Sequence, residues 1–342
     1  MFRPVENADY HPPGTYAMSH FKSKVTVYTN EDGLRVPSAG YKLPKEKPAG
    51  QFRIAFLGGS VVQLASTYET TLPGSLKTLL RQKYPGRDIE VINAGIQSCV
   101  SRQSIAQLLF TLVDYHPDIV ILYDGVNDLG LPLTYESRPN FPYNFQTMEE
   151  AWDAYRAERQ DSIWHLALER SNLYRLIRAR LYPDQRKLVP TADAPFAGTN
   201  AVAPDKILND RSYTVNHVAE YLSNWRKLIE LSAAYHYKPV LILNAVGGLD
   251  PGYAAPLLMS DYHLDRATAE QWARAFDLLY AEAGRQIDGM RGEYHDAVFM
   301  NLVHALNPPE KYFWDNLHVY DEANMILAER IYTGIQPQVE PR

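Results

Sequence analysis

Residues 53–60 read Arg-Ile-Ala-Phe-Leu-Gly-Gly-Ser, and this stretch decides the fold class. The apolar run from Ile54 to Leu57 predicts a short buried strand. Gly58 and Gly59 end the strand, because glycine is typical of tight turns. We therefore expect Ser60 to lie just beyond the carboxyl end of a strand.

Strands and helices alternate outward from this stretch. Further strands are predicted at residues 89–94 and 118–123, with a fourth at 238–244 and another near 297–303. Amphipathic helices are predicted between them, from the leucines at 72, 76, 79 and 80 and from the stripe that follows Ser101, a candidate N-cap. This order implies right-handed crossovers and a parallel sheet that is covered on both faces. The predicted fold class is α/β.

The chain divides into three parts by the pattern of its hydrophobic and polar residues. Residues 1–50 lack periodicity, and we expect an irregular N-terminal extension that packs on the core. Residues 51–130 and 213–342 form the predicted core. Residues 131–212 form a helical and loop insertion after the third strand, which is a candidate cap beside the active site.

The composition is typical of a globular protein. Hydrophobic residues make up 46% of the 342 residues and charged residues 22%, with a formal net charge of -6. This charge disfavours nucleic acid as a partner, and the apolar runs are far shorter than the roughly 20 residues of a membrane helix. The single cysteine, Cys99, excludes an internal disulfide and a cysteine-based zinc site. We find no signal peptide in this sequence, and we expect either a cytoplasmic protein or an extracytoplasmic one whose signal or anchor has been removed, so localisation and oligomeric state stay open.

Residues that suit acyl-transfer chemistry follow the predicted strands. Ser60 follows the first strand, residues 95–99 the second and Asn127 the third, and ligands of parallel sheets bind beyond these strand ends. A serine hydroxyl needs a base that is itself held in one orientation. Asp315 and His318, three residues apart near the C-terminus, can supply an orienting carboxylate and a base. The Asn127 amide and a backbone N–H after the second strand are candidate donors to an oxyanion.

Four short blocks resemble, in order, those of the SGNH (GDSL-like) hydrolase family. They are residues 58–60, 93–98, 125–128 and 315–318. The resemblance implies a flavodoxin-like three-layer α/β/α fold with about five parallel strands. It also implies esterase, lipase, thioesterase or carbohydrate deacetylase activity without a metal or organic cofactor.

The same resemblance assigns roles to individual residues. Ser60 is the nucleophile, His318 the base, Asp315 its orienting partner and Asn127 an oxyanion donor. The family's oxyanion glycine falls on Ser98, which is our first choice for the backbone donor, with Gly95 as the alternative. A positive φ would cost a serine about 1 kcal/mol or more.

These observations favour a serine esterase that hydrolyses a small acyl ester, with O-acetyl groups on carbohydrate as a candidate substrate. The 24 tyrosines suit stacking on sugars as well as ordinary packing. An acyltransferase with the same triad, and a non-catalytic binding protein on the same fold, are the alternatives. A metal site at Asp315 and His318 lacks a third ligand, and Gly58-Gly59 lacks the third glycine of a dinucleotide site.

Overall fold

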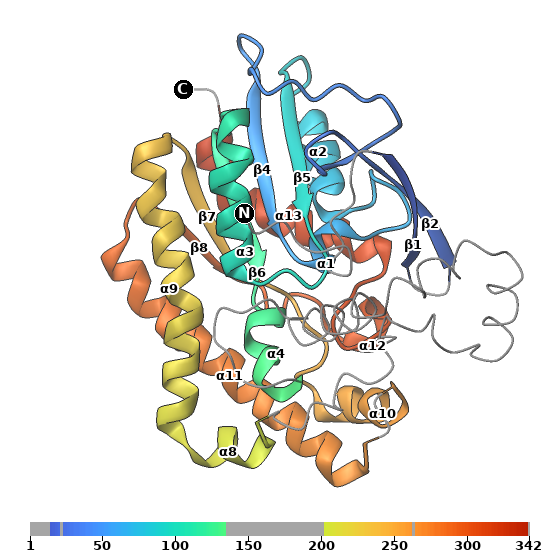
Figure 1. Cartoon of the computed structure of the whole chain (residues 1–342), viewed down its shortest axis with the longest axis vertical. Coiled ribbons are helices and arrows are strands. Elements are labelled where there is room, and N and C mark those ends of the chain that lie inside the picture. Colours follow the sequence, from blue (N-terminus) through green and yellow to red (C-terminus); the bar gives the residue numbers. More distant parts are fainter. Residues whose placement is uncertain (1–13, 21–22, 135–201, 262–263, 341–342) are drawn as a thin grey trace, which may run out of the picture.

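The computed structural model describes residues 14–20, 23–134, 202–261 and 264–340. This part of the chain forms one mixed sheet with helices on both faces (Figure 1). The strands are β1 (Gly14–His20), β2 (Ser23–Thr29), β3 (Arg35–Val36), β4 (Phe52–Gly58), β5 (Ile89–Gly95), β6 (Ile119–Asp124), β7 (Lys238–Leu243) and β8 (Val298–Asn301). The helices are α1 (Ser60–Gln63), α2 (Leu72–Lys83), α3 (Ser101–Phe110), η2 (Leu112–Tyr115), α4 (Val126–Thr134), α8 (Pro204–Asn209), α9 (Arg211–Tyr235), α10 (Pro251–Asp261), α11 (Arg266–Glu293), α12 (Pro309–Tyr312) and α13 (Asp321–Val339).

The centre of the sheet is parallel. The strands lie in the order β1-β2-β3-β5-β4-β6-β7-β8, and all neighbours from β5 to β8 pair in parallel. In chain order these parallel strands are the second, first, third, fourth and fifth, which is the flavodoxin-like order. The predicted α/β class and the parallel sheet of about five strands are confirmed.

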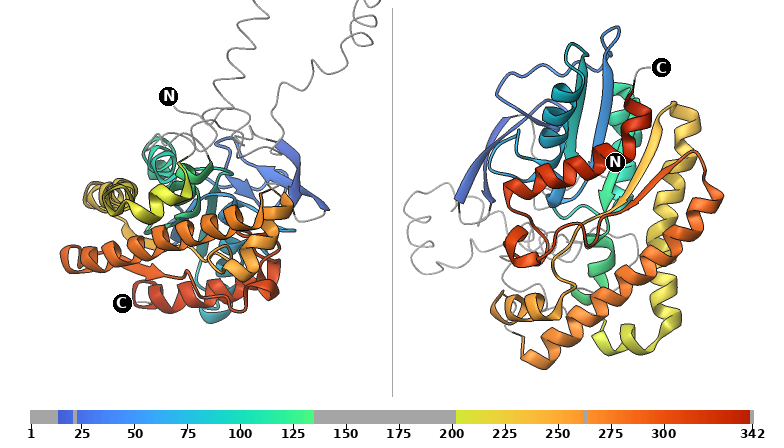
Figure 2. Two further views of the ribbon diagram at one scale, coloured as in Figure 1. Left: turned by 90° about the horizontal axis from the view of Figure 1, so that it is seen from below. Right: turned by 180° about the vertical axis from the view of Figure 1, so that it is seen from behind.

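Helices cover the two faces of the sheet because successive strand residues point to opposite sides. Ile54 and Phe56 of β4 belong to the core beneath α2 and α13, whereas Ala55 and Leu57 belong to the core beneath α3, α9 and α11. Figure 1 shows α3 and α9 in front of the sheet, and the right view of Figure 2 shows α13 on the opposite face. All four of these β4 side chains are fully buried, so both faces are dry.

The expectation of an irregular N-terminal extension was wrong for residues 14–36. Residues 14–36 contain β1, β2 and β3, which pair antiparallel and join the sheet through Arg35 opposite Asn93 of β5. Val25 and Val27 of β2 are buried and contact Leu64, just beyond α1. The alternation of valine and threonine in 25–29 is the strand signal that the sequence offered there.

Most of the predicted insertion, residues 131–212, lies outside the described residues. The described part comprises its first residues, which complete α4, and residues 202–212, which contain α8 and the start of α9. Its role as a cap therefore remains a prediction. Among the described helices, none combines the length and apolar character that a membrane span requires.

Candidate active site

Ser60 lies at the carboxyl end of the sheet because two glycines bring the chain sharply out of β4. Gly58 has a φ of 153°, and a Cβ there would lie 2.3 Å from the Tyr123 carbonyl oxygen of the neighbouring strand β6. No side chain fits at that position. The turn after Gly58 therefore places Ser60 at the first position of α1, where the residue is partly exposed.

The loop between α12 and α13 brings the predicted base to the predicted nucleophile. His318 Nε2 lies 2.8 Å from Ser60 Oγ, and His318 Nδ1 lies 2.7 Å from Asp315 Oδ2. Both distances are those of hydrogen bonds. The structure thus brings Ser60, His318 and Asp315 into one continuous hydrogen-bonded chain.

Asp315 also fixes the loop that carries the imidazole. Its Oδ1 accepts the backbone N–H groups of Leu317 and His318, at 2.7 and 2.6 Å. The carboxylate therefore uses one oxygen for the main chain and the other for the imidazole ring. Because three donors converge on it, the carboxylate has little freedom to rotate away from His318.

Two aromatic residues that the sequence analysis missed support this loop. The Tyr253 hydroxyl of α10 lies 2.9 Å from the Phe313 carbonyl oxygen and 3.0 Å from that of Asp315. The Trp314 ring stacks on the His318 ring, with centroids 5.0 Å apart and planes 13° apart. Stacking on an indole face favours the cationic imidazolium. Tyr253 carries no sequence signal, whereas the position of Trp314 beside Asp315 could have drawn attention to it.

The electrostatics of the pair suit proton transfer. Burial by itself would raise the pKa of Asp315 and lower the pKa of His318. The attraction between the two charges and their hydrogen bond outweigh burial, so the pKa of Asp315 lies below its usual value and that of His318 lies above it. The site therefore favours a proton on His318 while Asp315 stays ionised.

Asn127 lies beside the nucleophile in the first turn of α4. Its Nδ2 donates to the Cys99 carbonyl oxygen at 2.8 Å. A Cβ added at Gly59 would lie 2.9 Å from the same Nδ2, which places the amide directly against the backbone before Ser60. An amide nitrogen carries two N–H groups, and Cys99 takes one of them.

The two candidate backbone donors have different positions. Gly95 pairs with Gly58 in the sheet, and its N–H donates to Asn93 Oδ1 at 3.0 Å, so this N–H is already used. A Cβ at Gly95 would lie 2.5 Å from the Gln63 nitrogen of α1, which gives this glycine a steric role. Ser98 follows in the turn after β5 with a φ of 53°, a left-handed conformation. Ser98 therefore remains the candidate donor, and the alternative, Gly95, does not fit.

Asp128 ties the turn after β5 to α4. Its two carboxylate oxygens accept the Ser101 hydroxyl at 2.6 Å and the Ser101 N–H at 2.9 Å. We expected Ser101 to be the N-cap of its helix, and this prediction was wrong. Ser101 is the first residue of α3, and Val100 is the N-cap. The Ser101 hydroxyl donates to Asp128 and also accepts a hydrogen bond from Asn224 Nδ2 of α9, at 2.9 Å.

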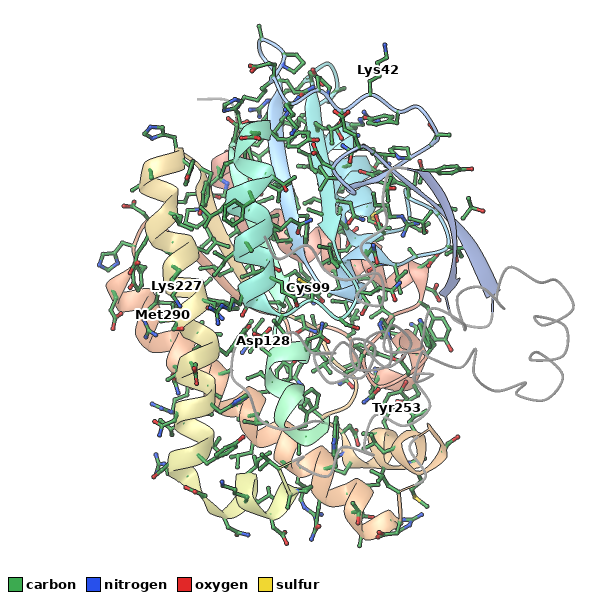
Figure 3. The ribbon with its side chains drawn as sticks, in the orientation of Figure 1. Lys42, Cys99, Asp128, Lys227, Tyr253 and Met290 are labelled. Carbon is green, nitrogen blue, oxygen red and sulfur yellow. The ribbon has the colours of Figure 1, made fainter. Side chains whose placement is uncertain are left out.

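Asp124 is a second buried carboxylate, and it interacts electrostatically with Asp128. Asp124 Oδ1 at the end of β6 accepts the Tyr221 hydroxyl at 2.7 Å and Trp225 Nε1 at 3.0 Å. Burial raises the pKa of Asp124 well above its usual value and raises that of Asp128 to about 6. Figure 3 shows Asp128 and Cys99 close to the strand ends, with Tyr253 beyond them near α10.

Within the described ranges, no cluster of three or more histidine, cysteine or acidic side chains is arranged to hold a metal ion. The thiol of the buried cysteine contacts groups outside the Ser60–His318–Asp315 chain. Cys99 Sγ contacts the Val100 carbonyl oxygen and the Ser104 hydroxyl, and burial raises the pKa of the thiol to about 12. A thiol with so high a pKa is a weak nucleophile at neutral pH.

Comparison with known proteins gives similar solved structures only. No family model matches the chain, and no curated protein matches it. A catalytic mutant of an acetylxylan esterase from Geobacillus stearothermophilus is similar with a TM-score of 0.45 at 15% identity, over 85% of this chain and 97% of that one. An α/β hydrolase enzyme from the metagenome of Lake Arreo, Spain, is similar with a TM-score of 0.40 at 13% identity, again over 85% and 97%. These values are too low to assign an activity.

The left-handed backbone at Ser98 gives a testable difference in stability. This conformation costs an L-residue about 1–2 kcal/mol and suits β-branched residues least. Ser98→Gly should therefore be more stable than Ser98→Val by about 1–2 kcal/mol, measured as the free energy of unfolding in urea. The same two substitutions at Gln97, whose φ is not positive, should give the reverse order. Equal stability of the two Ser98 variants would contradict a left-handed residue 98.

Proposed function

We propose that this protein is a serine esterase of the SGNH type that hydrolyses small acyl esters, with O-acetylated carbohydrate as the substrate class. The observation that carries the proposal is the hydrogen-bonded chain from Ser60 Oγ through His318 to Asp315, at 2.8 and 2.7 Å. A nucleophile, a base and an orienting acid at hydrogen-bond distances are what acyl transfer through serine requires.

Acylation begins at the Ser60 hydroxyl. Ser60 Oγ attacks the carbonyl carbon of the ester while its proton passes to His318 Nε2, which lies 2.8 Å away. Asp315 holds the Nδ1 proton of the ring and stabilises the resulting imidazolium. His318 then returns the proton to the alcohol oxygen as the C–O bond breaks, which leaves an acyl-Ser60 ester and the free alcohol.

Deacylation reverses the roles with water in place of the alcohol. His318 removes a proton from water, the oxygen attacks the acyl carbon, and the proton then passes to Ser60 Oγ as the acid leaves. Both steps develop a negative charge on the former carbonyl oxygen. We assign the second N–H of the Asn127 amide and the backbone N–H of Ser98 to that oxygen. Each such donor lowers a barrier by about 3 kcal/mol.

Replacing the nucleophile is the direct test. Ser60→Ala should lower the kcat for p-nitrophenyl acetate by about 10⁴-fold or more, because the remaining groups have no hydroxyl to activate. Thermal unfolding should stay close to that of the unmodified protein. Ser66→Ala is the matched control, because this exposed serine lies six residues away in the loop after α1 and donates its backbone N–H to the Asp321 carboxylate. Full activity of Ser60→Ala would defeat the assignment.

The dependence of rate on pH tests the role of the Asp315–His318 pair. His318 must be neutral to act as a base, and its pKa lies above 6.5, so kcat/KM should fall as the pH drops through a limb centred above pH 6.5. In Asp315→Asn the carboxylate no longer raises this pKa, while burial still lowers it. The limb should therefore move to lower pH, and kcat should fall by about 10³- to 10⁴-fold. An unchanged limb would show that another group controls the rate.

The substrate class needs a separate comparison. We expect p-nitrophenyl esters to be hydrolysed faster with acetate than with palmitate, and acetylated oligosaccharides to release acetate. Hydrolysis that favours palmitate would point to a lipase and would contradict the small-acyl proposal. The same reactions with added free sugar detect transfer, since an acylated sugar as the main product would make the protein an acyltransferase.

A further inference from the structure

The helix that carries the proposed nucleophile is a single turn. After Ser60–Gln63 the backbone becomes extended at Leu64, whose N–H donates to the Ser60 carbonyl oxygen at 2.8 Å. The later carbonyl groups have no following helical turn to satisfy them. Val62, Gln63 and Ala65 are all buried, so these oxygens need donors from elsewhere in the protein.

Side chains of two sheet strands supply those donors. Asn93 of β5 donates from Nδ2 to the Val62 carbonyl oxygen at 3.2 Å. Arg35 of β3 donates from one guanidinium nitrogen to the Gln63 carbonyl oxygen and from the other to that of Ala65, at 3.3 Å. Arg35 and Asn93 are direct neighbours across the β3–β5 pair. The end of α1 is thus held by a strand of the N-terminal extension.

The burial of a charged arginine at position 35 needs a physical reason. Its side chain is buried, with 2% of the residue exposed. Burial lowers the pKa of the guanidinium to about 10, so the group is still charged at neutral pH. A buried charge is costly, and a well-packed apolar residue often stabilises a protein as well or better. The forked donors of arginine, however, can bind two carbonyl oxygens at once.

Arg53 provides an internal comparison. It is fully buried as well, and it donates to the carbonyl oxygens of Tyr115 at 2.8 Å and Lys45 at 2.9 Å. Arg53 thus joins the N-terminal segment to the core near the start of β4, seven residues before Ser60 and at the opposite end of that strand. Both arginines bind main-chain oxygens, but Arg35 binds the segment that follows the nucleophile and Arg53 does not.

The chain directly after the clamped residues borders an open pocket. This pocket of about 330 Å³ is lined by Arg35, Tyr68 and the exposed Ser66 and Thr67, so the backbone beyond Ala65 is not closely packed on that side. A shift of α1 would change the separation between Ser60 Oγ and His318 Nε2, because the imidazole is held independently by Asp315. A misplacement of about 1 Å can cost 10²-fold in rate.

We propose that Arg35 is a positioning residue for the nucleophile, which holds the end of α1 so that the Ser60 hydroxyl stays within reach of His318. This inference rests on the proposed function of Ser60. It assigns the N-terminal extension a part in catalysis, through one side chain that acts by holding the backbone after the nucleophile.

The test compares Arg35→Ala, Arg35→Lys and the matched control Arg53→Ala in the full chain. Each variant is measured for thermal unfolding, for kcat and KM with p-nitrophenyl acetate, and for the rate at which a fluorophosphonate labels Ser60. We expect Arg35→Ala to lower kcat and the labelling rate by about 10- to 100-fold with KM changed less than about twofold. Arg35→Lys should recover part of kcat, because an ammonium can still donate to one of the two carbonyl oxygens. Arg53→Ala should lower the unfolding temperature yet keep kcat and labelling within about twofold.

Each outcome decides the question. If Arg35→Ala does not fold, Arg35→Lys takes its place. The proposal is then supported if Arg35→Lys has a lower kcat than the unmodified protein while its unfolding temperature is no lower than that of Arg53→Ala. Folded Arg35 variants with unchanged kcat and labelling would overturn it, as would an equal loss of kcat in Arg53→Ala. If the unmodified protein neither hydrolyses esters nor labels at Ser60, the proposed function fails and this inference fails with it. Activity in the unmodified protein with no effect at Arg35 defeats this inference alone.

Discussion

The hydrogen bond between Ser60 Oγ and His318 Nε2 joins residues 258 positions apart, and the rest of the site depends on it. It forms because the turn after β4 and the loop before α13 reach the same edge of the sheet. A bond of 2.8 Å tolerates little displacement at either end. The surrounding contacts can therefore be divided into those that hold the hydroxyl and those that hold the imidazole.

Close backbone packing at three glycines and the side chains of Arg35 and Asn93 hold the hydroxyl end. Gly58, Gly59 and Gly95 each lie where a Cβ would approach a neighbouring atom to within 3 Å, and those atoms belong to β6, Asn127 and α1 respectively. Such spacing lets the turn after β4, the turn after β5 and α4 converge on a small volume. The imidazole end is held by a separate set of groups, the carboxylate of Asp315 and the ring of Trp314. The two ends are thus fixed by different groups and can be perturbed separately.

The sequence predicted the features that depend on local pattern and on a known block order. The strand before Ser60 follows from its apolar run, and the pairing of Asp315 with His318 follows from their short spacing. Contacts between distant segments gave no such signal. Tyr253 reaches its carbonyl oxygens about sixty residues along the chain, and the Ser101 hydroxyl binds Asp128 instead of capping its own helix. The strands of residues 14–36 are hard to recognise in the sequence because the alternation in β2 is short and proline and glycine residues surround it.

Asp124 and Asp128, two buried acids near Asn127, show how burial changes the charge of a site by raising the pKa of its carboxyl groups. A negative charge that develops near Asn127 would be repelled by ionised carboxylates in the same region, and Asp128 is its neighbour in the chain. Burial and the neighbouring Asp128 raise the pKa of Asp124, which favours its neutral form, and the Tyr221 hydroxyl and the Trp225 indole occupy one of its oxygens. Asp128 keeps its hydrogen bonds from Ser101 and so fixes the turn that contains Ser98. Burial of Asp124 therefore limits the negative charge near the site where the proposed reaction develops its own.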